Sequence, residues 1–333
     1  MADVEAPRPD AGGGLQQMLD AEQAVRERHP QPARDAVPTE YRRWARVVAD
    51  ELASLVTAPV DERASISDGV VAGATVRWNV RVYAPRGAAD EVLPTQLFLH
   101  GGGYVGGSPY ELVNDSLLAA RSVETGLRII SLEYPLAPEH PYPTARDAAV
   151  DVYRTLAERA DEFGIDASRF GIGGNSAGST IVSSAALLMT REGGSVPMHV
   201  FLEVPAVSVA AVLAAIESDL ADHPAVAAQL DGDIGVLDAY APHVDELTFV
   251  GDADDLTGFP PSLLMIAELD VLRSGGEKLA DRLRAQGTPV EVHLMVGHLH
   301  GSPGATAVFG GAREWQRILD GALRRAYGTE QPG

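Results

Sequence analysis

The segment best suited to chemistry is Gly174-Asn175-Ser176-Ala177-Gly178, which has the form G-x-S-x-G. It follows a predicted apolar strand and opens a predicted helix. Such a strand-to-helix turn holds its serine in a strained conformation with the hydroxyl exposed, and the small neighbours let backbone approach closely. The helix N-terminus behind the serine also favours negative charge on a bound carbonyl oxygen. This context predicts a serine nucleophile and disfavours a chance glycine-rich turn.

A second glycine-rich segment, His100-Gly101-Gly102-Gly103-Tyr104, follows another predicted strand, residues 96–99. An oxyanion hole needs backbone N–H groups with no side chains in the way, and glycines supply that access. A flexible loop or a phosphate-binding turn is the alternative, but no P-loop lysine accompanies these glycines. The two segments together therefore favour acyl-transfer chemistry at a serine.

The composition limits the partners. The chain has 333 residues, 45% of them hydrophobic, and 26 Lys+Arg against 47 Asp+Glu give a formal charge of -21. Such a charge repels phosphate backbones and anionic lipid headgroups, so we expect no nucleic acid partner and no stable membrane association. An ordinary acidic surface, a salt-adapted one and a field that steers cationic ligands all remain compatible with it.

Cysteine usage and hydropathy exclude further classes. With no cysteine, a thiolate nucleophile, a disulfide and a Cys-ligated metal site are all excluded. Residues 1–14 lack the basic start and apolar run of a secretory signal, so a cytoplasmic location is expected. The longest nearly apolar stretch, residues 204–216, is too short to span roughly 30 Å of hydrocarbon, and we interpret it as a buried segment.

Short apolar runs alternate with helical patterns along most of the chain, which predicts an α/β fold with a mainly parallel central sheet flanked by helices. Strands are predicted at residues 75–83, 96–99, 128–132, 169–173, 200–204, 262–267 and 290–295. Helices are predicted at residues 144–163, 177–191, 275–286 and 305–327.

Two amphipathic helices are predicted before the first strand. Their apolar stripes are Leu15, Met18, Leu19 and Val25, then Tyr41, Trp44, Val48, Leu52 and Leu55. The side chains of Arg42, Arg43 and Asp50 are expected to turn away from the second stripe. The pair could pack on the main domain, cover a substrate cleft or contact a membrane.

Taken together, these motifs resemble the bacterial branch of the hormone-sensitive lipase family of esterases. The resemblance continues through the proline-rich segment 136–143 and through Gly258-Phe259-Pro260-Pro261 to residues 268–272, and it covers roughly residues 75–327. It implies an α/β-hydrolase fold with a helical cap. The expected division is a tail with cap helices at 1–60 and a catalytic domain at 61–330, with a cap insertion at about 206–245.

The same resemblance implies the roles of individual residues. Ser176 would be the nucleophile, His300 the general base and Asp270 the residue that orients it, in the chain order of α/β-hydrolases. The oxyanion hole would be formed by the N–H groups of Gly102, Gly103 and Ala177. No cofactor and no metal are required.

Alternatives exist for the acid and the base. Glu268 competes with Asp270, although it more naturally supports the loop. His298 competes with His300, and with His293 the three histidines could also form a metal site.

Other polar residues near the motifs are interpreted as structural. His100 and His140 are expected to anchor their loops by hydrogen bonds. The cluster Asp252, Asp254 and Asp255 lacks the glycine and the bidentate glutamate of an EF-hand.

The expected activity is hydrolysis of short- to medium-chain acyl esters through an acyl-enzyme on Ser176. Asn175, Pro135 and Ser302 depart from the family's usual Asp, Arg and Phe, which favours a specialised substrate such as a natural-product ester or lactone. The rivals are an acyltransferase and a non-catalytic ligand-binding protein of the kind that lacks the catalytic histidine. A small-molecule ester is the expected partner, and a homodimer is common in the resembling family.

Overall fold

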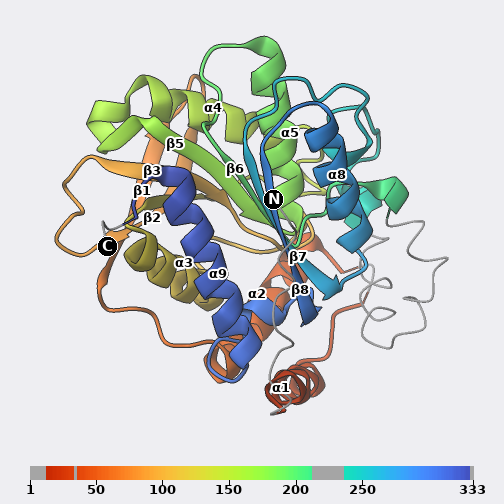
Figure 1. The fold of residues 1–333 in the computed structure, drawn as a ribbon. Helices are drawn as coiled ribbons and strands as arrows, with labels where there is room; N and C mark the ends of the chain where they lie inside the picture. The colour runs from red at the N-terminus through yellow and green to blue at the C-terminus, as the bar shows by residue number, and fades with distance from the viewer. Residues whose placement is uncertain (1–12, 34–35, 212–235, 331–333) are drawn as a thin grey trace.

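A central sheet organises the computed structural model, which describes residues 13–33, 36–211 and 236–330. Within these residues the sheet has 8 strands in the order β1-β2-β4-β3-β5-β6-β7-β8 (Figure 1). The strands are β1 (Ala64–Ala72), β2 (Arg77–Pro85), β3 (Leu93–Leu99), β4 (Arg128–Leu132), β5 (Ile165–Asn175), β6 (Val200–Glu203), β7 (Ser262–Leu269) and β8 (Val290–Leu299). Only the pairs β1·β2 and β2·β4 among these are antiparallel, so the predicted mainly parallel sheet is confirmed.

Helices cover both faces of the sheet. One face carries α3 (Leu112–Thr125) and α9 (Gly310–Tyr327), and the other carries α4 (Thr144–Glu158), α5 (Ala177–Glu192) and α8 (Arg273–Ala285) (Figure 1). Parallel strands covered on both faces read as continuous apolar runs, and β4 and β6 are buried at every residue. Each face therefore has its own hydrophobic core.

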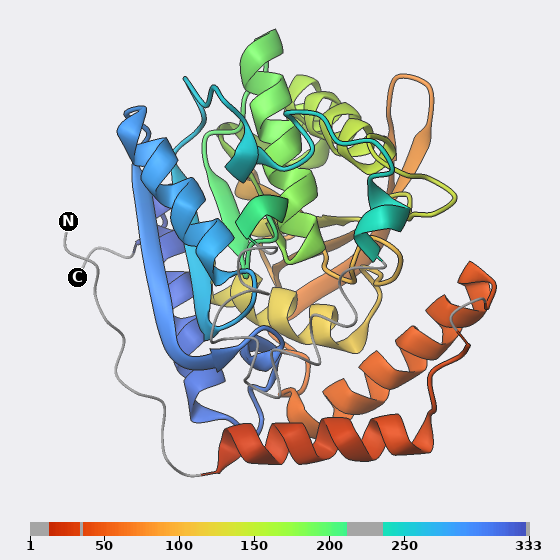
Figure 2. The same ribbon diagram turned by 90° about the vertical axis from the view of Figure 1, so that its right-hand side faces the viewer.

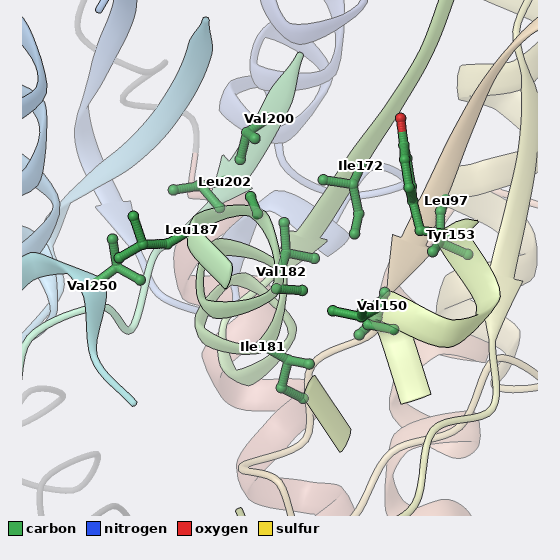
Figure 3. Packing of buried hydrophobic residues seen from close by; sticks show 14 of the residues in the cluster. Leu97, Val150, Tyr153, Ile172, Ile181, Val182, Leu187, Val200, Leu202 and Val250 are labelled. Carbon is green, nitrogen blue, oxygen red and sulfur yellow. The ribbon is translucent and has the colours of Figure 1, made fainter. Parts of the chain in front are cut away.

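The larger core lies between the sheet and helices α4 and α5. Ile172 of β5 and Leu202 of β6 point towards Val182 of α5, and Leu97 of β3 lies beside Tyr153 of α4 (Figure 3). Ile172, Leu202 and Val182 are fully buried. This packing fixes the carboxyl end of β5, where the G-x-S-x-G segment begins.

One strand and one α-helix of the structure were not predicted from the sequence. Strand β1 pairs with β2 in an antiparallel hairpin, although only the second strand was predicted. Helix α3 was not predicted because its packed face includes polar side chains such as Asn114, Ser116 and Arg121, which break the apolar periodicity. Helix α9 begins at Gly310, five residues later than predicted, because residues 305–309 form a turn in which the N–H of Phe309 donates to the carbonyl of Ala305 at 2.8 Å.

The helices that precede the sheet are α1 (Gly14–Arg28) and α2 (Pro38–Val56). Figure 2 shows them, in red and orange, as a pair along the lower side of the molecule. Met18 and Val56 pack with Leu299 and Phe309, so the pair docks on the segment that follows β8. Leu55 of the predicted stripe is instead 49% exposed.

Part of the predicted organisation lies outside the described residues. The tail before residue 13 and most of the predicted cap insertion, residues 212–235, belong to this part. Among the residues that are described, no helix combines the length and apolar character needed to cross a membrane.

We predict that Ile172→Ala lowers the free energy of unfolding by about 2 to 5 kcal/mol, because it leaves a cavity beside α5 that the rigid sheet cannot fill. Urea unfolding followed by circular dichroism measures the change. Val70→Ala, at a 43% exposed position on β1, is the control and should stay within about 0.5 kcal/mol of the parent. Equal losses in both variants would contradict the assignment of the core.

Candidate active site

The turn between β5 and α5 places Ser176. Its backbone is strained, with φ 52° and ψ −122°, and its N–H donates to the carbonyl of Glu203 at 2.9 Å. A Cβ atom on Gly174 would lie 2.7 Å from the backbone of Gly178, and one on Gly178 would lie 2.1 Å from the carbonyl oxygen of Leu99. Glycine is therefore required on both sides of the serine, as the motif predicted.

Three predicted side chains meet at this turn. His300 Nε2 lies 2.9 Å from Ser176 Oγ, and His300 Nδ1 lies 2.7 Å from Asp270 Oδ2. Asp270 is buried, and its other oxygen accepts the N–H of Leu272 at 3.0 Å. With the proton on Nδ1 donated to Asp270, Nε2 can accept the serine proton. The arrangement can make Ser176 a nucleophile.

The competing residues have other tasks. Glu268 accepts the N–H of Gly297 at 2.7 Å and so supports the bend before His300. His293 hydrogen bonds Glu291 at 2.7 Å on β8. In residues 13–33, 36–211 and 236–330, no group of three or more His, Asp and Glu side chains is placed to hold a metal ion.

His298 is buried on the α9 side of the loop. Its ring lies between Phe309 and Trp315, with centroids 5.0 Å and 5.1 Å away, and burial lowers its pKa to about 4. Its Nδ1 lies 2.8 Å from Ser302 Oγ, which also accepts the N–H of Leu299 and donates to the carbonyl of Leu299. Ser302, one of the departures from the family pattern, thus ties His298 into the turn that presents His300.

The segment after β3 adopts three consecutive left-handed conformations, with φ 123° at Gly102, 59° at Gly103 and 64° at Tyr104. A Cβ atom on Gly102 would lie 2.4 Å from the carbonyl oxygen of Gly106, so a larger residue cannot replace it. Tyr104 is held by a 2.8 Å hydrogen bond to Thr180 and by stacking on Tyr240. This segment, residues 100–107, is called the oxyanion loop below.

His100 begins the oxyanion loop as an anchor. Its Nδ1 donates to the carbonyl of Gly101 at 2.7 Å, and its ring stacks on Tyr134. Burial lowers its pKa to about 4, so the ring is neutral at pH 7. His140 is exposed, and its anchoring bond runs from its main-chain N–H to the carbonyl of Leu136.

A cavity opens in front of Ser176. Its lining consists of Gly103, Tyr104, Ser176, Ala177, Ala206, Ser208, Val209, Val236, Leu237, Phe249, Leu272 and His300. Two of the three predicted oxyanion residues, Gly103 and Ala177, therefore share a surface with Ser176 and His300. Most of the remaining wall is apolar, as a site for acyl groups requires.

Asp252 anchors one wall of this cavity. Its carboxylate accepts the hydroxyl of Ser208 at 2.6 Å and the N–H of Val209 at 3.0 Å, and it pairs with Lys278 at 2.9 Å. The carboxylate therefore caps the start of the segment that leads towards residue 212. Asp252 therefore has a structural role, consistent with the interpretation that its cluster resembles a calcium loop only superficially.

A buried polar group behind Ser176 was missed in the sequence. Glu203, whose carbonyl holds the N–H of Ser176, receives the indole N–H of Trp315 at 2.7 Å and lies 3.4 Å from Arg121. Arg121 is 1% exposed and lies over the rings of Phe98 and Phe201. A glutamate inside an otherwise apolar strand was the available signal, because buried carboxylates need partners.

Comparisons with known proteins agree with this geometry. Residues 96–303 match the model of a family described as having the alpha/beta hydrolase fold. The esterase LipI of Mycobacterium tuberculosis is 30% identical over 272 residues, which is 80% of this chain and 84% of the relative. The carboxylesterase NlhH of the same species is 34% identical over 74% of this chain and 78% of the relative.

A solved structure extends the agreement. The ester-hydrolase EH1AB1, from the metagenome of Lake Arreo, superposes with a TM-score of 0.80 at 27% identity, covering 98% of this chain and 100% of that one. The chain therefore belongs to the α/β-hydrolase family, and the prediction from its motifs is confirmed. Within that family it is a bacterial esterase of the hormone-sensitive-lipase type, a serine carboxylic-ester hydrolase.

From the lowered pKa of His298 we predict how the free energy of unfolding depends on pH. Between about pH 4 and 6.5 His298 is neutral in the folded protein, whereas the unfolded chain takes up a proton there. The folded parent therefore loses stability at this site as the pH falls through that window. In His298→Gln this loss is absent, so the parent-minus-variant difference in free energy of unfolding shrinks from pH 7 to pH 5, by at most about 1.4 kcal/mol per pH unit.

Urea unfolding of both proteins at several pH values measures this difference, in which contributions from the other titrating groups cancel. A difference that stays constant from pH 7 to pH 5 would mean that folded His298 takes up its proton as readily as the unfolded chain.

Proposed function

We propose that this esterase works through an acyl-enzyme formed on Ser176, with His300 as general base and Asp270 as its orienting partner. One observation carries the proposal: the hydrogen bonds from Ser176 to His300 and from His300 to Asp270 form a continuous line at the cavity. A serine hydroxyl is inert at its free pKa, and this line supplies the base that activates it.

The reaction has two halves. Ser176 Oγ attacks the ester carbonyl while His300 Nε2 accepts its proton, and the charge of the imidazolium is stabilised by Asp270. His300 then gives the proton to the departing alcohol, which leaves an acyl group on Ser176. Water repeats the attack, again passing its proton to His300, and His300 then returns that proton to Ser176 Oγ as the free acid leaves.

Each tetrahedral intermediate carries a negative oxygen. The N–H groups of Gly102, Gly103 and Ala177 would bind it, and the N-terminus of α5 adds its favourable dipole. Loss of one such donor typically costs on the order of 10²- to 10³-fold in rate.

The walls of the cavity favour short- to medium-chain acyl groups. Leu237 and Phe249 line the same space as Ser176, so bulky apolar side chains bound the space that an acyl chain would enter. Asn175 adds a departure close to the reaction, since its buried Oδ1 has no hydrogen-bond partner in the described part of the chain. A polar group of the substrate could hydrogen bond to residues such as Asn175 that differ from the family's usual ones. The physiological ester would then be a specialised one, such as a natural-product ester or lactone.

The proposed domain division follows the order of elements. Residues 1–60 would supply a tail and the cap helices, because α1 and α2 precede β1, and residues 61–330 would form the catalytic domain. An insertion at about 206–245 would complete the cap, since Ala206, Val209 and Leu237 all line the cavity. The homodimer and the cytoplasmic location stay predictions.

The proposal predicts that Ser176→Ala and His300→Ala each lower kcat for p-nitrophenyl acetate by about 10⁴-fold or more, because nucleophile and base act as a unit. Asp270→Asn should cost about 10⁴-fold, because it disturbs the tautomer of His300. Release of p-nitrophenol measures all three. The exposed His140→Ala is the control and should match the parent; a Ser176→Ala protein with parental activity would eliminate the acyl-enzyme.

The cavity also predicts chain-length preference. The parent should prefer p-nitrophenyl acetate and butyrate to octanoate, and Leu237→Ala should raise the octanoate-to-acetate ratio of kcat/KM by roughly 10-fold, since each methylene in an apolar pocket changes discrimination by about that factor or more. Val244→Ala, at a 64% exposed position of the same region, is the control. An unchanged ratio in Leu237→Ala would place the acyl chain elsewhere.

A further inference from the structure

Helix α2 reaches the oxyanion loop through one side chain. Arg42 donates from Nε to the carbonyl of Val105 at 2.9 Å and from Nη2 to the carbonyl of Ala137 at 2.8 Å. Both nitrogens of its fork also pair with the carboxylate of Glu139, at 3.0 Å and 2.5 Å. The side chain expected to turn away from the apolar stripe thus binds main-chain atoms of the catalytic domain.

These bonds connect the two chain segments on either side of Tyr104. The N–H of Ala137 donates to the carbonyl of Tyr104 at 3.0 Å, and Val105 follows Tyr104 in the chain. Arg42 therefore holds the segment of Val105 and the segment of Ala137 against each other next to Tyr104. A guanidinium suits this task because its planar fork presents several donors in a fixed geometry, which an ammonium does not.

The conformation of the oxyanion loop needs such support. Three consecutive left-handed residues end at Tyr104, where a side chain makes that conformation unfavourable. The carbonyls of Gly102 and Gly103 are already taken by the N–H groups of Gly106 and Val105. The carbonyl of Val105 accepts instead from Arg42, which lies outside the loop, as the carbonyl of Tyr104 accepts from Ala137.

We propose that Arg42 is a positioning residue: it holds the oxyanion loop in the conformation in which the N–H groups of Gly102 and Gly103 meet the charged intermediate. The inference rests on the proposed function, because it assigns Arg42 to the same oxyanion hole. Since exposed ion pairs contribute little, the two carbonyl bonds carry the effect and the pair with Glu139 only orients the guanidinium.

The rest of α2 extends the same contact. Arg46 donates to the carbonyl of Tyr110, and Asp50 accepts the N–H of Leu112 at 2.8 Å, so the helix follows the chain from the oxyanion loop to the start of α3. At its other end the carbonyl of Val56 accepts the N–H of Ala307, in the segment after His300. One helix thus touches both loops of the active site.

The test compares Arg42→Met with Arg43→Met, which removes the same charge from the exposed neighbouring position on α2. Kinetics with p-nitrophenyl butyrate are normalised to the fraction of protein that an organophosphonate titrates. We expect kcat of Arg42→Met to fall by about 10-fold with KM changed less than about 2-fold, a part of the loss seen when an oxyanion donor is removed. The affinity for a trifluoromethyl ketone, whose adduct carries the same oxyanion, should fall by a similar factor.

Two further variants separate positioning from simple support of the fold. Glu139→Gln keeps the carbonyl bonds and should retain kcat, whereas Arg42→Lys keeps the charge but cannot span both carbonyls and should lose kcat. The inference is overturned if Arg42→Met keeps the parental kcat, or if Glu139→Gln loses as much as Arg42→Met. An inactive parent would overturn the proposed function as well, whereas an active parent with an active Arg42→Met protein overturns this inference alone.

Discussion

The strained backbone of Ser176 is the constraint around which the site is built. Its left-handed conformation persists only because the end of β5 and the start of α5 are clamped between neighbouring strands. Gly178 lies so close to the carbonyl of Leu99 that β3 cannot shift without disturbing the serine. The same contact sets the oxyanion loop, which leaves β3 at once, beside the nucleophile. On the other side, Glu203 at the end of β6 holds the N–H of the serine, so three adjacent strands define one atom's position.

The acid and the histidine reach this point through the order of the sheet. Parallel strands β7 and β8 lie next to each other and end on the same edge, so Asp270 and His300 leave the sheet side by side. Glu268 binds the N–H of Gly297 and Ser302 hydrogen bonds His298, so both shape the segment that presents His300. The chemistry thus depends on few residues, while their placement depends on many short contacts.

Sequence reasoning succeeded where the deciding interactions are local. The strand, the glycines and the helix around Ser176 follow one another in the chain, and this context was enough to predict the turn; the family was predicted from this segment together with the other motifs. It failed where a contact joins distant segments or where polar groups are buried. Arg121 lies on the packed face of helix α3, and Arg42 binds Ala137, which is 95 residues away in the chain. Neither contact produces a periodic pattern of apolar residues from which it could be predicted. Choosing between His298 and His300 likewise required the packing of Phe309 and Trp315.

Lys278 is the single lysine among 333 residues, and the sequence has no cysteine. Its side chain is 43% exposed, and its ammonium pairs with Asp252, the carboxylate that caps the segment forming one wall of the cavity. Among the side chains, amine-directed coupling to a solid support would therefore react at Lys278 alone, at a point joined to that wall through Asp252. Acylation of Lys278 would remove its charge, while Asp252 would keep its bonds to Ser208 and Val209. Immobilisation of this esterase through its lysine would thus leave the side chains of Ser176, His300 and Asp270 unmodified.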